Sequence, residues 1–271
     1  MQRGRIQVSA ILLMLGLAFS GAAFSRAYDC LMEPMQTVEI SSPVAGVLET
    51  VLVKRGDPVK KGQVIATLDS RTERAAMEAA KLRSEAMGPT QTARKKIEFS
   101  QQKYERRKLM ANDQLMTGQE RDDAEAELRI AQAELQTAQE NRAIAAREYA
   151  QQASLVAQRT LRSPFDGVVL DRLLSPGELT ESSGTKKGIL KLAQIHPIRV
   201  HLVLPEQLFG RLKIGDAVNV QPQYAGARLL AAKVSQIDRL IDAASGTFAV
   251  FMTIPNPDLS IPAGMRCKVE L

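Results

Sequence analysis

Few side chains in this chain could form a covalent bond or hold a metal ion. The 271 residues contain two cysteines, Cys30 and Cys267, and two histidines, His196 and His201. Neither histidine is close to a cysteine in the sequence, so support for a metal site is poor. The chain has no G-x-S-x-G, H-E-x-x-H, P-loop or paired C-x-x-C pattern, the patterns that supply a nucleophile, zinc ligands or a phosphate cradle. We therefore expect no enzymatic activity, no metal and no cofactor.

The two cysteines lie far apart in the sequence. Cys267, Val269 and Leu271 alternate as they would in a strand with one apolar face, so Cys267 is expected to point into that face. If the chain is exported to an oxidising compartment, Cys30 and Cys267 could form a disulfide that links the first strand to the last. The alternative is two unpaired, buried thiols.

The first 27 residues have the pattern of a secretory signal peptide. Arg3 and Arg5 form a positive start, an apolar run extends over 11–19, and Ser25 and Ala27 are small residues where a signal peptidase would read them. We expect residues 1–27 to be removed on export.

An uncleaved membrane anchor is the alternative for the same segment. The uncharged stretch 6–25 is close to the roughly 20 residues that span a bilayer. The formal net charge is +6, and it falls to about +3 without residues 1–27, because they carry three arginines and no acid. No basic cluster interleaved with aromatic residues is present, so nucleic acid is not an expected partner.

One short motif occurs twice, and it predicts a split domain. Residues 42–48 read S-P-V-A-G-V-L and residues 163–170 read S-P-F-D-G-V-V-L. The copies stay in step as far as Gly56-Asp57 and Gly177-Glu178, and Lys60-Lys61-Gly62 is matched, after a short insertion, by Lys186-Lys187-Gly188. Each half is too small to bury a core, whereas the two together could close one small β-sandwich.

The stretch 72–157 between the two copies has helical periodicity. Its second arm shows the 4-3-4-3 spacing of a coiled-coil seam, interrupted by Arg142 and Gln152. The seam residues of this arm are Ala124, Leu128, Ala131, Leu135, Ala138, Ala145, Tyr149 and Val156. The weaker seam of the first arm is predicted at Ala75, Ala79, Leu82, Ala86, Ala93, Ile97 and Tyr104.

Two features of the first arm predict where its helix is interrupted and where it ends. Pro89 removes a helix hydrogen bond, so we expect a kink or break near Met87. Asn112-Asp113 and Thr117-Gly118 mark the turn between the arms. Each arm of about 40 residues would be about 60 Å long.

The remaining residues, 195–271, predict a second β module. Alternating apolar residues, as at Phe248, Val250 and Met252, and turn residues between the short strands suggest a small antiparallel barrel, to which 28–40 adds a strand. The predicted fold is α+β and elongated: a split lipoyl-like β-sandwich with an inserted antiparallel helical hairpin, plus a small antiparallel β-barrel. The predicted domains are a signal peptide at 1–27, a sandwich at 39–69 and 160–193, a hairpin at 70–159, and a barrel at 28–38 and 194–271.

This order of elements resembles the periplasmic adaptor, or membrane fusion protein, family of tripartite efflux and secretion systems. The motifs that carry the resemblance are V-x-R-G-D-x-V-K-K-G-Q around Gly56, R-S-P-F-D-G-V-V from Arg162, S-G-T-F from Ser245 and P-A-G-M-R-C from Pro262. It implies a non-catalytic protein of the periplasm, associated with the inner membrane, that joins an inner-membrane transporter to an outer-membrane channel as a homo-oligomer, with a ring of six copies expected. The class of transporter stays open: a resistance-nodulation-division pump, another transporter or a polysaccharide export machine.

In that family the hairpin tip meets the outer-membrane channel. A recurring tip pattern there is arginine, leucine four residues later and serine seven after that, and this chain has Arg106, Met110 and Thr117 at the same spacing. Leu115 and Met116 in the turn are expected to be exposed apolar groups, which favours a docking tip. A structural alternative, compatible with docking, is that Arg106 is a solvated helix residue, Met110 packs in the seam and Thr117 caps the second helix.

The half-sandwich also resembles a biotinyl or lipoyl carrier domain, in which a lysine between the halves receives the cofactor. Here that position reads Leu68-Asp69-Ser70-Arg71-Thr72. Arginine cannot form the required amide, so a carrier role is not expected. Two other functions stay open: a lipoyl-like binding protein that forms no conduit, and a coiled-coil scaffold of the cell envelope.

Overall fold

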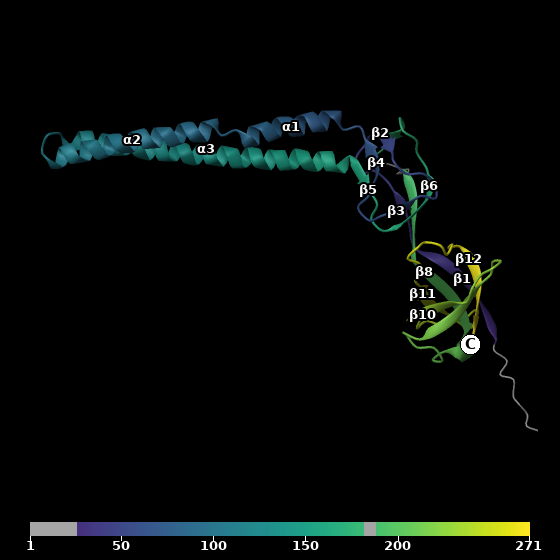
Figure 1. The fold of residues 1–271 in the computed structure, drawn as a ribbon. Helices are drawn as coiled ribbons and strands as arrows, with labels where there is room; N and C mark the ends of the chain where they lie inside the picture. The colour runs from purple at the N-terminus through teal and green to yellow at the C-terminus, as the bar shows by residue number, and fades with distance from the viewer. Residues whose placement is uncertain (1–25, 182–187) are drawn as a thin grey trace, which may run out of the picture. The chain divides into compact units, whose positions relative to one another are not determined.

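The structure is a computed structural model of the chain that describes residues 26–181 and 188–271 (Figure 1). Residues 1–25 of the predicted signal peptide therefore lie outside the described residues, and so do Lys186 and Lys187 of the second repeat. The described residues divide into two compact units. The sandwich unit consists of described residues between Glu33 and Arg199 together with Pro255–Ala263, and the barrel unit consists of residues 26–32, Val200–Ile254 and Gly264–Leu271.

The sandwich unit is built from both copies of the repeated motif. Its strands are β2 (Gly46–Val51), β3 (Pro58–Val59), β4 (Val64–Leu68), β5 (Thr160–Arg162), β6 (Gly167–Arg172) and β7 (Leu179–Thr180). One sheet has the order β5-β4-β2-β7, and β3 pairs with β6. Strands of the first half pair with strands of the second half in three places, β4 with β5, β2 with β7 and β3 with β6, so the two halves form one domain.

The turns of the two copies repeat the same hydrogen bonds. The hydroxyl of Ser42 donates to the carbonyl of Val44 at 2.5 Å, and the hydroxyl of Ser163 donates to the carbonyl of Phe165 at 2.6 Å. Both serines are buried, where an unpaired hydroxyl would be costly. This agreement confirms that the sequence repeat is a structural repeat.

A second pair of turns ties each half to the other. Gly56 and Gly177 have φ angles of 91° and 92°, a conformation that glycine adopts without strain. The N–H of Gly56 donates to the carbonyl of Val169, and the N–H of Gly177 donates to the carbonyl of Leu48. Among the described residues, the enclosed core contains thirteen buried residues from both halves: Leu48, Val53, Val59, Ile65, Ala66, Leu68, Leu161, Phe165, Val169, Leu174, Ile189, Leu190 and Leu192.

Three helices connect the halves as an antiparallel hairpin, in which α1 and α2 run along α3 (Figure 1). They are α1 (Arg71–Glu85), α2 (Gly88–Asn112) and α3 (Gly118–Gln158). The break predicted near Met87 is confirmed, since Ala86 has an extended backbone and Pro89 occupies the first turn of α2. Proline is tolerated there because its missing N–H would have had no partner within the helix.

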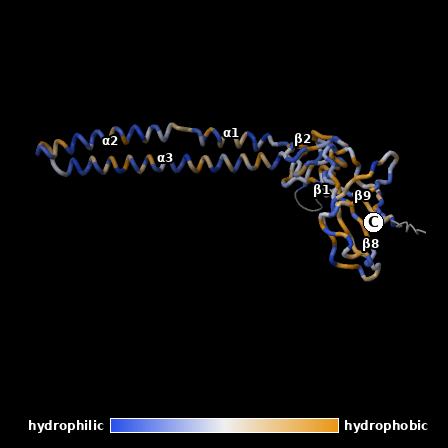
Figure 2. Tube along the Cα trace, turned by 60° about the horizontal axis from the view of Figure 1, so that its bottom comes forward, coloured by the Kyte–Doolittle hydropathy of each residue, from blue (hydrophilic) through white to orange (hydrophobic). Residues whose placement is uncertain are grey.

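The seam predicted for the second arm is confirmed. All eight predicted seam residues of α3 are buried or half-buried, with Ala124 and Ala131 fully so. Figure 2 shows hydrophobic residues recurring along α3 between hydrophilic ones. Alanine at the centre of the seam lets the two helices approach closely.

The seam predicted for the start of the first arm is wrong. Ala75, Ala79, Leu82 and Ala86 are exposed, and Ala80 is the buried residue of α1. Several stripes of α1 are equally rich in alanine, so the apolar pattern does not select one of them. Beyond the break, the predicted Ala93, Ile97 and Tyr104 do lie in the seam.

The barrel unit contains a closed six-stranded sheet. Its strands are β1 (Ala27–Ile40), β8 (Leu190–Pro205), β9 (Ala217–Pro222), β10 (Leu230–Ile237), β11 (Thr247–Ile254) and β12 (Met265–Glu270), with a short 3₁₀ helix at Glu206–Leu208. The order is β1-β12-β9-β10-β11-β8, closed by pairing of β1 with β8. The unit boundaries at 32/33 and 199/200 lie inside β1 and β8, so they differ from the boundaries expected at 38/39 and 193/194.

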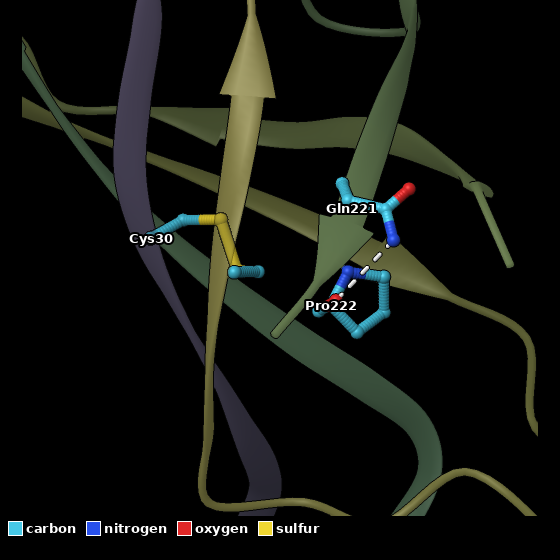
Figure 3. The surroundings of a disulfide bond; sticks show 4 residues. Cys30, Gln221 and Pro222 are labelled. Carbon is cyan, nitrogen blue, oxygen red and sulfur yellow. Dashed lines mark hydrogen bonds between the residues drawn. A yellow bond between two sulfur atoms is a disulfide. The ribbon is translucent and has the colours of Figure 1, made fainter. Parts of the chain in front are cut away.

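A disulfide joins the first and last strands of the barrel. Cys30 on β1 and Cys267 on β12 are directly opposite in the antiparallel register, with Cα atoms 4.8 Å apart. Figure 3 shows the sulfur bridge between these strands beside Gln221 and Pro222 of β9. Both cysteines are buried, and Cys267 points into the apolar interior with Val269.

Candidate functional site

The turn at the end of the hairpin is held by backbone hydrogen bonds. The N–H of Leu115 donates to the carbonyl of Met110 at 2.9 Å, and the N–H of Gln114 donates to the carbonyl of Ala111 at 3.1 Å. These two bonds are the Schellman motif, which ends a helix through one left-handed residue. That residue is Gln114, with φ of 61°. The turn is therefore a defined structure and not a loose connection.

The start of α3 completes the turn. The hydroxyl of Thr117 accepts a hydrogen bond from the N–H of Glu120, and the carboxylate of Glu120 accepts one from the N–H of Thr117, which is a capping box. The alternative role considered for Thr117, as helix cap, is confirmed. Thr117 remains exposed while it caps α3, so its capping role is compatible with a docking role.

The structure brings the predicted tip residues to one end of the hairpin, but to different surroundings. Leu115 is 77% exposed and Met110 is 46% exposed, so the expectation that Met110 packs in the seam is wrong. Met116 is half-buried and so less exposed than expected. Arg106 is exposed, and its side chain donates to the carbonyl of Gln102 one turn earlier.

Two interhelical contacts brace the hairpin just behind the turn. The ammonium of Lys103 lies 2.7 Å from the carboxylate of Glu127, and this hydrogen bond lowers the pKa of Glu127. The guanidinium of Arg107 donates to the backbone carbonyl of Glu120 at 3.1 Å. The ion pair between Lys103 and Glu127 is partly exposed, so it contributes little to stability. Together the two contacts fix the lateral register of the two helices.

The two arms of the tip half carry opposite charge. α2 has seven basic and two acidic residues, whereas α3 has eight acidic and four basic residues. Some of these charges pair across the hairpin, as in Lys96 with Glu134. Arg94 and Arg106 of α2 and Asp123 of α3 form no ion pair with any residue that the structure describes. Helix α2 is therefore basic overall and helix α3 is acidic overall.

A second cluster fixes the base of the hairpin, and sequence reasoning missed it. The guanidinium of Arg159, just after α3, forms an ion pair with Glu73 in the first turn of α1 and also donates to the carbonyl of Ala45. A Cβ atom at Gly46 would overlap this guanidinium, so a larger residue there would displace the Arg159 side chain from this position. The sequence signal for this cluster was weak, because Glu73 and Arg159 are 86 residues apart and belong to no motif.

The position of the carrier lysine in lipoyl-like domains is occupied by the start of α1. Ser70 is buried and precedes the helix, and Arg71 binds the carboxylate of Asp69 at 2.7 Å. This hydrogen bond from Arg71 lowers the pKa of Asp69 to about 2. The exposed hairpin that a carrier needs has been replaced by a helix.

The histidines take part in packing. His196 accepts a hydrogen bond at Nδ1 from the N–H of Asn256, and the ring of His201 stacks on Phe251 with centroids 4.9 Å apart. Within residues 26–181 and 188–271, no cluster of three or more metal-ligating side chains occurs. In the same ranges no helix is both long and apolar enough to cross a membrane.

Comparison with protein families matches both units. Residues 36–186 match the CzcB-like barrel-sandwich hybrid domain, and residues 198–271 match the CusB-like β-barrel domain. Among solved structures, MacA from Actinobacillus actinomycetemcomitans superimposes with a TM-score of 0.74 at 22% identity, over 91% of this chain and 78% of that one. The membrane fusion protein Spr0693 from Streptococcus pneumoniae gives 0.61 at 17% identity, over 91% and 98%.

Two curated relatives extend the comparison. The cobalt-zinc-cadmium resistance protein CzcB of Cupriavidus metallidurans is 23% identical over 87% of this chain and 42% of its own length. The macrolide export protein MacA of Escherichia coli O157:H7 is 26% identical over 68% of this chain and 50% of its own length. The chain thus spans about half the length of these relatives. With the fold, the turn and both domain matches in agreement, this chain belongs to the membrane fusion protein family.

Proposed function

We propose that the chain is a non-catalytic periplasmic adaptor, held at the outer face of the inner membrane, that links an inner-membrane transporter to an outer-membrane channel for efflux or secretion. The observation that carries this proposal is the hairpin turn. A hydrogen-bonded cap at each helix end holds Leu115 in solvent, far along a helical arm inserted between two halves of one domain. An exposed leucine on a rigid turn is a ready contact for a partner.

The tip is proposed to dock on the channel through Leu115, Met110 and Arg106. Burying a leucine side chain contributes roughly 1.5–3 kcal/mol, and the preformed turn lowers the entropy lost on binding. Met116 and Thr117 would shape the contact, Thr117 by keeping α3 capped. No catalytic group is needed for this role.

Neighbouring copies are proposed to pack side by side in a ring, with six as the expected number. The net positive charge of α2 in one hairpin is complementary to the net negative charge of α3 in the next. Such a contact joins two different surfaces, and heterologous contacts form a ring when the rotation between copies closes. Exposed apolar residues on both arms, including Phe99, Ile130 and Ile144, would be buried there. The barrel is assigned to the transporter and the sandwich to its neighbours in the ring.

Site-specific photocrosslinking in intact cells tests the tip. A photoreactive amino acid at position 115 is expected to capture an outer-membrane protein. The matched control is position 82, since Leu82 is also exposed on the hairpin but lies in α1, near its base. Capture of the same outer-membrane protein from both positions, or from neither, would contradict docking by the tip.

Deletion of residues 72–157 tests whether the hairpin is required for transport. The deleted chain keeps every strand of the sandwich, and transport is expected to be lost. Two initial readouts are the accumulation of zinc and the accumulation of a macrolide in cells. Zinc is chosen because of the name of CzcB, and the macrolide because of the name of MacA. Unchanged transport by a folded deletion variant would favour the envelope-scaffold role, and a modified lysine in the mass spectrum would favour the carrier-like role.

A further inference from the structure

The hairpin is joined to the sandwich by two short links, which together we call the root of the hairpin. Asp69 and Ser70 connect β4 to α1, and the single residue Arg159 connects α3 to β5. The N–H of Leu68, at the end of β4, donates to the carbonyl of Arg159 at 2.8 Å, so the two links lie side by side. Because both helices leave the sandwich at one place, contacts at the root decide the direction in which the hairpin points.

The side chain of Arg159 contacts the hairpin and the sandwich at once. Its guanidinium forms an ion pair with Glu73, in the first turn of α1, and its Nη1 donates to the carbonyl of Ala45 at 3.2 Å. Ala45 belongs to residues 42–48, the first copy of the repeated motif of the sandwich. One side chain therefore holds a helix of the hairpin against a turn of the sandwich.

The ion pair of Arg159 with Glu73 is well covered. The two side chains are 20% and 22% exposed, whereas those of Lys96 and Glu134, farther along the hairpin, are 51% and 44% exposed. Salt screens a covered pair less than an exposed one, and the planar guanidinium binds its acceptors in fixed directions. The contacts of Arg159 are therefore suited to hold one geometry at the root.

Gly46 leaves free the space that the guanidinium occupies. A Cβ atom at position 46 would overlap Nη1 of Arg159. The equivalent glycine in the second copy of the motif, Gly167, has a different role, because a Cβ atom there would overlap the backbone carbonyl of Ala193 in β8. The first copy thus accommodates an arginine at the root of the hairpin, whereas the second accommodates a neighbouring strand.

We propose that Arg159 is a positioning residue that sets the direction in which the hairpin leaves the sandwich, and that Gly46 provides the space for it. The inference rests on the proposed function, because the direction of the hairpin decides where its tip meets the channel. Helix α3 has 41 residues. At that length, about 60 Å, a rotation of about 10° at the root moves the tip by about 10 Å.

Distances between two spin labels on the purified chain test the proposal. One label replaces Gln139, about 30 Å along α3 from Arg159, and the other replaces Lys60 or Glu49 on the sandwich. All three labelled positions are exposed, and the two native cysteines take no label because they form a disulfide. Arg159→Ala and Gly46→Ala are each expected to shift or broaden at least one of the two distance distributions by about 5 Å.

Two variants and one label pair serve as controls. Gly118→Ala adds a Cβ atom that would meet no other atom, and Arg147→Ala removes another arginine of α3 that is exposed. Both are expected to keep the wild-type distances. Labels at Lys108 and Gln139, both within the hairpin, are expected to keep their distance in every variant, which shows that the helices stay intact.

The double variant Gly46→Ala/Arg159→Ala tests whether Gly46 acts through Arg159. Its distances are expected to equal those of Arg159→Ala, because the added methyl group then has no guanidinium to displace. Wild-type distances in Arg159→Ala, or a further shift in the double variant, would overturn the proposal. These distances are measured without a channel, so a negative result here and a failure of capture from position 115 are separate outcomes.

Discussion

Removal of the disulfide between Cys30 and Cys267 is expected to lower the free energy of unfolding of the barrel by about 2.4 kcal/mol. The bridge spans 237 residues of sequence, and closing a loop of that length in a fully unfolded chain corresponds to about 5.5 kcal/mol. If the sandwich unit stays folded, it already holds residues 33–199 and 255–263. The bridge then closes a loop of only about 7 flexible residues, which corresponds to about 2.4 kcal/mol.

A reporter confined to the barrel separates this effect from unfolding of the hairpin. Phe209 packs edge-on against Phe248 with ring centroids 5.2 Å apart, and the chain has no tryptophan, so Phe209→Trp supplies a unique signal. Urea unfolding of this variant is compared with and without a reducing agent. For a barrel of this size, a loss of about 2.4 kcal/mol moves the midpoint by about 2 M urea.

The control is the Cys30→Ala/Cys267→Ala variant in the same reporter background, whose midpoint is expected not to respond to the reducing agent. A reduced midpoint within about 0.5 M of the oxidised one would refute the loop-closure reasoning. Two free thiols in protein purified from cells and denatured without reductant would show that the bridge is not formed in the cell.

Three further predictions concern the hairpin and its base. Ala131→Leu is expected to destabilise the hairpin by about 1–3 kcal/mol, because Ala131 is fully buried in the seam; the exposed Ala133→Leu is the control, and equal thermal unfolding by circular dichroism would refute the close approach of the helices. Gln114→Gly is expected to raise the stability of the hairpin by roughly 0.5–1 kcal/mol by relieving the left-handed conformation; no gain over Gln114→Ala would count against the Schellman turn. The pKa of Asp69 is lowered to about 2 from 3.8, so its contribution is present above pH 3.8 and is lost as the pH falls through 2. An NMR titration of Asp69 that shows the same midpoint in the wild type and in Arg71→Gln would contradict that cause.

The architecture was predictable because it depends on local and repeated patterns. The motif at 42–48 and 163–170 revealed a split domain, since neither copy can bury a core alone. The α3 seam followed from spacing, and Pro89 marked the helix break because its ring and missing N–H act locally. These inferences needed no knowledge of which distant residues meet.

Tertiary contacts decided the rest. The buried stripe of α1 could not be read from alanine-rich spacing, because several stripes offer the same apolar area and only packing against α3 selects Ala80. The pairing of Arg159 with Glu73 and the choice between a bridge and two thiols at Cys30 depend on distances across 86 and 237 residues. Sequence by itself determined which segments are helix or strand and that the two halves belong together. Only the fold decided which faces are buried and which side chains are left for partners, because burial is a property of the packed chain and not of any local segment.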